Sequence, residues 1–279
     1  MRTQNLWILI ALLAAPSVVC AQWLDHPTPG LPRTKDGKPN LTAKTPRAAD
    51  GHPDLSGLWQ TEAAPREVLM KLLPGGVNGT AEDPPPAYFL NIMYDFGTGE
   101  QLMQPEAAAL FRKRAQNFTE ESPLSHCLPE GFPMVEIAPA PYKIIQGTGM
   151  IVMLYERDTT FRQIYMDGRK LPADPSPSWL GYSTGRWEGD ELVVETVGLN
   201  ARSWLDARGH THSEALHVTE RFHRLDIGHM ELRMTLDDPK TYLKPFTITL
   251  KQHLRPDTDL LENFCGENEK DLAHIEGKY

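Results

Sequence analysis

The sequence predicts a mainly β protein: an antiparallel meander that closes into a calycin-like barrel or packs as a sandwich, with minor helices. From residue 142 onward the chain contains successive short runs, the first two dense in apolar residues and later ones alternating between apolar and polar residues, and turn residues separate the runs. The clearest turn is Glu188-Gly189-Asp190, a hairpin signal between two such runs. The expected strands are residues 143–146, 150–155, 161–166, 182–187, 191–197, 215–224, 229–236 and 246–254.

The last three expected strands can be assigned to faces. The apolar side chains of 216–222, 230–236 and 246–250 all stand at even positions, so hairpin pairing must join even residues to even residues. A turn over residues 224–228 does this and predicts Phe222 opposite Met230. The same register predicts Val218 opposite Met234, Arg221 opposite Glu231 and Glu220 opposite Leu232.

The rest of the chain divides into a helical and an extended part. Ala, Leu and Arg content after Pro105 predicts a helix over residues 105–117, and a second short helix is expected at 267–275. Residues 22–53 are rich in Pro and contain a nonapeptide pattern twice, at 33–41 and 47–55. Each copy holds an Asp-Gly turn signal followed by Pro two residues later. We therefore expect an extended arm at 22–53 and one β-rich domain at 54–279.

The first 21 residues have the pattern of a signal peptide. Arg2 precedes an apolar run at residues 6–15, and Val19-Cys20-Ala21 is typical of cleavage before Gln22. Lipidation of Cys20 is the alternative, which Val19 disfavours. No later segment approaches about 20 consecutive apolar residues, so no integral membrane span is expected. The chain is predicted to be exported, to the periplasm or beyond.

Charge and cysteine content restrict the functional classes. Without the signal peptide, 27 basic residues stand against 37 acidic ones, and no basic cluster of the kind that binds nucleic acid occurs. Cys127 and Cys265 are the remaining cysteines. In an oxidising compartment they are expected to form a disulfide, with two buried free thiols as the alternative.

Glu220 is the most informative single residue. The face assignment places its carboxylate among apolar side chains, where it needs a hydrogen bond, an ion pair or a proton. Such a group inside a barrel is a candidate acid, base or ligand anchor. The alternative is a strand end at which the carboxylate reaches water.

Histidines form a second candidate site. Five of the ten histidines lie between residues 210 and 229. His210 and His212 share a face of an extended chain and could hold Zn or a similar ion with His217, while Glu214 or Glu220 handles a proton. His217 has the opposite parity, so the three converge only if the chain bends near Ser213. The alternative is a loop whose histidines make hydrogen bonds.

Five stretches of the chain resemble a family of uncharacterised exported bacterial proteins. They are Asp-Leu-Ser-Gly-Leu-Trp at 54–59, Tyr-Met-Asp-Gly-Arg at 165–169, Gly-Tyr-Ser-Thr-Gly-Arg-Trp-Glu-Gly-Asp at 181–190, His-Val-Thr-Glu-Arg-Phe at 217–222 and Asp-Pro-Lys-Thr-Tyr at 238–242. Gly57 and Trp59 are also similar to the opening of lipocalin-type barrels. The resemblance implies an exported protein.

These patterns lead to one main functional hypothesis: an exported barrel that binds a small, partly apolar molecule, with Glu220 and nearby aromatic residues lining the cavity. A metal-assisted hydrolase that uses the histidine cluster is one alternative. A partner-binding surface protein without a pocket is the other. The sequence makes no prediction of the oligomeric state.

Overall fold

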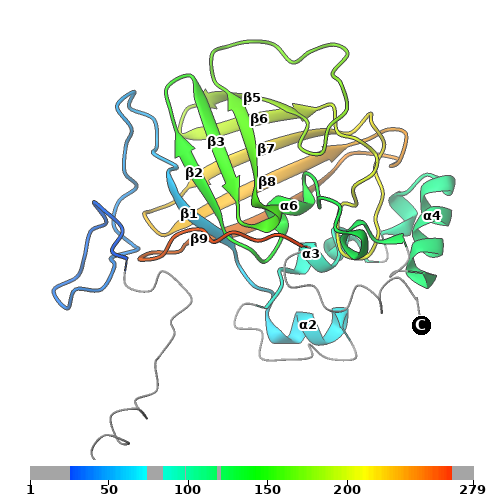
Figure 1. Cartoon of the computed structure of the whole chain (residues 1–279), viewed down its shortest axis with the longest axis horizontal. Helices are drawn as coiled ribbons and strands as arrows, with labels where there is room; N and C mark the ends of the chain where they lie inside the picture. The colour runs from blue at the N-terminus through cyan, green and yellow to red at the C-terminus, as the bar shows by residue number, and fades with distance from the viewer. Residues whose placement is uncertain (1–25, 74–83, 98, 118–120, 266–279) are drawn as a thin grey trace, which may run out of the picture.

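The computed structural model describes residues 26–73, 84–97, 99–117 and 121–265. Nine strands form a closed barrel in which each strand bonds to the next and the last bonds to the first (Figure 1). They are β1 (Gly57–Thr61), β2 (Tyr142–Gln146), β3 (Met150–Tyr155), β4 (Thr160–Tyr165), β5 (Tyr182–Glu188), β6 (Glu191–Val197), β7 (His217–Arg224), β8 (His229–Asp237) and β9 (Phe246–Leu254). The predicted mainly β fold is confirmed, as a barrel. The expected signal peptide and the helix at 267–275 lie outside the described residues.

The barrel differs from a pure antiparallel meander at one junction. Strand directions cannot alternate all the way around a closed ring of nine, so at least one neighbouring pair must be parallel. That pair is β4 and β5, joined by residues 166–181, which arch over the barrel in Figure 1. Ile164 pairs with Ser183 and Tyr165 with Thr184, and the register contains no further pairs. We call this junction the seam.

The predicted faces of the last three strands are confirmed. Burial alternates with period two along β7, β8 and β9, and the even positions are buried. Glu220 is fully buried between Val218 and Phe222 on the barrel's inner face. The outer face of the same strands carries the partly exposed histidines His217, His223, His229 and His253.

The predicted register of the β7–β8 hairpin is wrong by two residues. Phe222 pairs with Leu232 rather than Met230, and Glu220 pairs with Met234 rather than Leu232. Val218 therefore lies opposite Leu236, and Arg221 lies opposite Arg233. A two-residue shift leaves every side chain on its face, so the hydrophobic pattern does not distinguish the two registers.

The turn chemistry selects the observed register. The Leu225 amide donates to the His229 carbonyl at 2.9 Å, which leaves only residues 226–228 in the loop. Asp226 Oδ1 accepts the backbone amides of Gly228 at 2.9 Å and His229 at 2.8 Å. This side-chain turn stabilises a tighter loop than the five-residue one the sequence predicted.

Helices gather at one side of the barrel (Figure 1). The predicted helix at 105–117 is confirmed as α4 (Pro105–Gln116). The other helical segments are α2 (Arg66–Leu72), α3 (Ala87–Leu90), α6 (Met134–Ile137), η1 (Tyr94–Phe96), η2 (Glu100–Leu102), η3 (Pro123–His126) and η4 (Arg157–Thr159). All four residues of α6 are buried, so this short helix supplies side chains to the interior. No helix among the described residues has the length and apolar character needed to cross a membrane.

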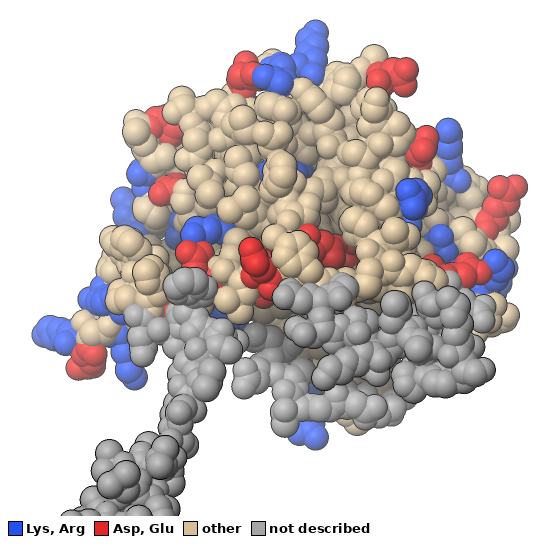
Figure 2. All heavy atoms as spheres, in the orientation of Figure 1, with Lys and Arg blue, Asp and Glu red and all other residues tan. Residues whose placement is uncertain are grey.

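The two arm repeats fold alike and attach to different barrel turns. In each, Arg pairs with the Pro six residues later, and its guanidinium donates to the carbonyl of the turn glycine at 3.0 Å. Arg33 then binds the carboxylate of Asp257, and Arg47 binds that of Asp190 through two hydrogen bonds of 2.7 Å. The arm at 26–53 therefore lies on the barrel at these two points. Figure 2 shows basic and acidic side chains interspersed on one face of the molecule.

Residues 257–265 form an extended strap that is anchored at every second residue. Asp257 binds Arg33, and Asp259 accepts two hydrogen bonds from Lys143 at 2.8 and 3.0 Å. Further along, the Leu261 amide donates to Glu156, and the Asn263 amide donates to Thr159 Oγ1. Cys265 closes the strap through a disulfide with Cys127. The predicted disulfide is thus present.

Candidate functional site

A buried polar cluster lies inside the barrel. At its centre is Arg162 of β4, whose side chain is 1 % exposed and whose ion-pair partners, Glu136 of α6 and Glu220 of β7, are fully buried. Arg162 Nη1 lies 3.0 Å from Glu136 Oε2 and 3.1 Å from Glu220 Oε1, and Nη2 also donates to Glu220. Two carboxyl groups therefore share one guanidinium.

The remaining Arg162 donors are also satisfied. Nε donates to Ser183 Oγ at 3.0 Å and Nη2 donates to Thr196 Oγ1 at 2.7 Å. The guanidinium carbon stands 4.0 Å from the centre of the Phe132 ring, within cation–π range. This full set of partners explains how a charged side chain is held in the core at acceptable cost.

Burial shifts the protonation of the cluster. It raises the pKa of Glu136 well above its usual value, and the nearby Glu220 carboxylate raises it further, against the opposing effect of Arg162. For Arg162, burial lowers the pKa, but Glu220 and the other partners outweigh burial and the net pKa is raised. The raised pKa favours protonation of Glu136, and with that proton in place Arg162 and the two glutamates carry no net charge.

Two polar atoms at this cluster, Glu136 Oε1 and the Tyr142 hydroxyl, are buried without a hydrogen-bond partner among the described residues. The neighbouring tyrosine behaves differently, because the Tyr155 hydroxyl donates to Glu136 Oε2 at 2.9 Å. The rings of Tyr142 and Tyr155 are 5.9 Å apart. Buried polar groups are rarely left without partners, so Glu136 Oε1 and the Tyr142 hydroxyl mark the part of the cluster where hydrogen bonding is incomplete.

Sequence reasoning found one member of this cluster and missed two. Glu220 was predicted at its observed position on the apolar face. Arg162 shares the parity of the buried Ile164, but the apolar Phe161 beside it points outward, which obscured the pattern. Glu136 stands in the run Met-Val-Glu-Ile, where the sequence predicted no helix. A charged residue within so short an apolar run is the signal that could have found it.

The structure does not bring the three candidate metal ligands together. His210 Nδ1 lies 2.5 Å from Asp206 Oδ2, His212 Nε2 lies 2.9 Å from Ser203 Oγ, and His217 Nε2 lies 3.5 Å from Glu195 Oε1 on the outer face. Within the described ranges, no three His, Cys, Asp or Glu side chains are grouped so that they could hold a metal ion. Glu214 is exposed in the same loop, apart from the buried Glu220.

The two buried histidines shape the loop between β6 and β7. Asp206 Oδ1 accepts the amides of Arg208, Gly209 and His210 at 2.9, 3.1 and 3.2 Å, so Asp206 and His210 together close a turn. His212 Nδ1 faces the Ser213 carbonyl at 3.0 Å and therefore carries the proton, which leaves Nε2 to accept the Ser203 hydroxyl. Burial lowers the pKa of His212, which keeps its ring neutral. This is the hydrogen-bonding loop that the sequence offered as the alternative to a metal site.

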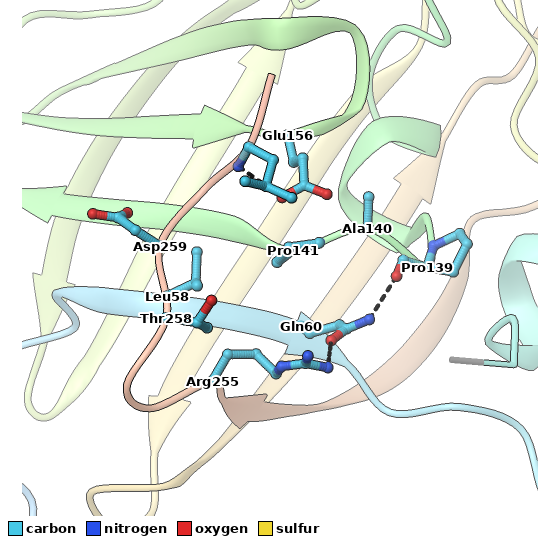
Figure 3. A pocket seen from close by; sticks show the side chains of 10 residues that line it. Leu58, Gln60, Pro139, Ala140, Pro141, Glu156, Arg255, Thr258 and Asp259 are labelled. Atoms are coloured by element: carbon cyan, nitrogen blue, oxygen red, sulfur yellow. Dashed lines mark hydrogen bonds between the residues drawn. The ribbon is translucent and has the colours of Figure 1, made fainter. Parts of the chain in front are cut away.

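Two hollows open beside and beneath the strap. One of about 160 Å³ is bordered by Gln60 of β1, Pro139, Glu156 and the start of the strap (Figure 3). Its Gln60 side chain donates to the Pro139 carbonyl at 2.6 Å and accepts from Arg255 at 2.6 Å. A hollow of about 280 Å³ shares Leu58 and Arg255 with it and continues toward residues 26–29. In the first hollow, the nitrogen and the oxygen of the Gln60 amide therefore each already have a partner within the protein.

A third hollow, of about 170 Å³, opens at the seam. It is bordered by residues 161–163 and Tyr165 of β4 and by residues 180–183. Arg162 and Ser183 of the interior cluster are among these residues. The seam is thus the place where a surface hollow borders two residues whose side chains belong to the buried polar cluster.

The fold and this cluster define a closed β-barrel protein with a polar centre. Neither the family models nor the curated proteins compared with the chain match it.

Proposed function

We propose that the protein is an exported barrel that binds a small, partly apolar molecule, whose polar group is held by the interior cluster. The observation that carries this proposal is the pair of unpartnered atoms, Glu136 Oε1 and the Tyr142 hydroxyl, beside a fully satisfied Arg162. An ion pair with an extra carboxyl is a costly way to fill a core that apolar residues could fill equally well. Binding of a ligand by Glu136 Oε1 and the Tyr142 hydroxyl would explain why such a costly polar cluster is present in the core.

Export is supported by the predicted signal peptide and by the disulfide between Cys127 and Cys265. Because the cluster is neutral as a whole, a ligand group that is itself uncharged fits it best. A hydroxyl or amide can donate to one of the free atoms and accept from the other.

Tyr142→Phe tests the proposal with little disturbance of the fold. The Tyr142 hydroxyl makes no hydrogen bond within the described residues, so its removal should leave the free energy of unfolding unchanged or raise it by about 1 kcal/mol. Native mass spectrometry of protein purified from the periplasm should show a bound molecule in the unmutated chain. We expect about tenfold weaker binding in the variant.

Tyr155→Phe is the matched control. It removes a hydroxyl that Glu136 uses, so it should lower stability in the absence of any ligand. A protein that carries no bound molecule and whose melting temperature no small molecule raises would contradict the proposal. A large exposed apolar contact surface found instead would favour the partner-binding alternative.

A further inference from the structure

We infer that the seam is the entry to the site and that it binds a planar aromatic group of the ligand. The inference rests on the proposed function and adds a location and a ligand class. Its starting point is the ring of nine strands, which forces a parallel junction. With two residue pairs, the β4–β5 junction is the shortest contact between neighbouring strands of the barrel.

The residues before Ile164 in β4 have no paired residue on the β5 side among the described residues. The wall of the barrel therefore opens beside residues 161–163, where the hollow of about 170 Å³ lies. Arg162 and Ser183, joined by a hydrogen bond of 3.0 Å, border it from the interior. A molecule in this hollow would lie next to the polar cluster.

Aromatic side chains dominate the outer wall of the hollow. Phe161 is 59 % exposed, an unusual state for a phenylalanine in the middle of a sheet. Tyr165 and Tyr182 stand across the seam with ring centres 5.2 Å apart and planes tilted by 31°. Arg169 covers the Tyr165 ring at 3.9 Å and donates to the Tyr182 hydroxyl at 3.3 Å. The two tyrosines are thereby held in place before any ligand arrives.

The size and charge of the hollow select the occupant. Pockets for drug-sized ligands measure about 300–1,000 Å³, so a hollow of about 170 Å³ holds a ring-sized group and excludes a lipid chain. Aromatic rings attract one another at centre distances of about 4.5–7 Å, a range within which a ring in the hollow can contact Phe161. Arg169 is neutralised by Asp167 and Arg162 by Glu220, so nothing here favours a charged ring. The ligand class is a neutral aromatic with a hydroxyl or amide, as in a phenol or an indole.

The experiment uses phenol and indole as probes on the full exported protein. Amide chemical shifts should move most at residues 161–165 and 180–184 when either probe is added. Phe161→Ala should weaken probe binding about tenfold, because one wall of the aromatic site is lost. Leu225→Ala is the matched control, since Leu225 is 58 % exposed in the β7–β8 turn, and it should leave binding unchanged.

The outcomes separate this inference from the proposed function. If Tyr142→Phe releases the copurified ligand while Phe161→Ala changes neither its binding nor that of the probes, the seam is not the entry and the binding function stands. Shifts mapped beneath the strap would also overturn the inference. If neither probe nor copurified molecule binds, both proposals fail.

Discussion

Replacing each of the two buried glutamates by glutamine should lower the free energy of unfolding by very different amounts, although both glutamates contact Arg162. Glu136→Gln mimics a carboxyl that is already protonated, and the new amide oxygen can accept from Tyr155 and Arg162 as Oε2 does. Its cost in free energy of unfolding should stay below about 1 kcal/mol. Glu220→Gln removes the counterion of Arg162, which costs about 3–5 kcal/mol unless Glu136, 3.0 Å from Arg162 Nη1, gives up its proton and takes over the ion pair.

The pH dependence adds a second signature. Folded Glu136 holds a proton that the unfolded chain releases above its ordinary pKa of 4.5. Its contribution to stability is therefore complete below that pH and is lost as pH rises toward the raised pKa of the folded state. Glu136→Gln has no such group, so its stability relative to the unmutated chain should improve as pH rises above 4.5.

Urea unfolding of both variants at several pH values measures these effects. For a chain of this size, the loss expected for Glu220→Gln corresponds to a fall in melting temperature of roughly 6–20 °C. Tyr142→Phe, measured alongside, controls for substitution within the cluster. Equal losses for the two glutamine variants would refute the assignment of the proton to Glu136.

Three further predictions concern the periphery. Burial raises the pKa of Glu130 to about 7 despite the ion pair of Glu130 with Arg157. The stability that protonated Glu130 contributes is therefore lost as pH rises from about 4.5 to 7. Urea unfolding should show that Glu130→Gln becomes more stable relative to the unmutated chain over that pH range. Reducing the Cys127–Cys265 disulfide, which joins residues 138 apart, should lower the free energy of unfolding by about 2–5 kcal/mol in matched oxidised and reduced samples, and an unchanged urea midpoint would contradict this. Arg47→Ala should speed proteolysis of the arm while leaving the barrel's urea midpoint unchanged, because the Arg47–Asp190 pair is exposed; Lys44→Ala is the control.

The strands could be predicted because a short run dense in apolar residues, as in β3, or period-two alternation, as in β9, indicates a segment that buries side chains in a sheet. The bounds of β3, β6 and β9 match the expected runs, and the Gly189-Asp190 turn joins β5 to β6 as predicted. The register of β7 with β8 could not be predicted in the same way, because a shift of two residues leaves every side chain on the same face of the sheet. The register is instead determined by the turn that Asp226 stabilises.

The seam and the centre of the cluster form only when the barrel closes, and barrel closure cannot be predicted from the residue pattern of a single segment. An odd number of strands around the ring requires a parallel pair, which falls between β4 and β5, and that number was not known until β1 joined β9. Arg162 and Glu136 come from segments that meet only in the closed barrel. Glu220 could be found because its own strand alternates cleanly.

The tandem arrangement of the arm makes its attachment bivalent. Each of the two ion pairs, Arg33–Asp257 and Arg47–Asp190, is exposed and therefore weak by itself. Once Arg47 has bound Asp190, however, Arg33 is confined near Asp257 at a high effective concentration. When one of these ion pairs breaks, the other therefore still holds the arm on the barrel until the broken pair forms again. Arg33 binds Asp257, the residue at which the strap begins, so the strap is held at one end by the arm and at the other end by the disulfide.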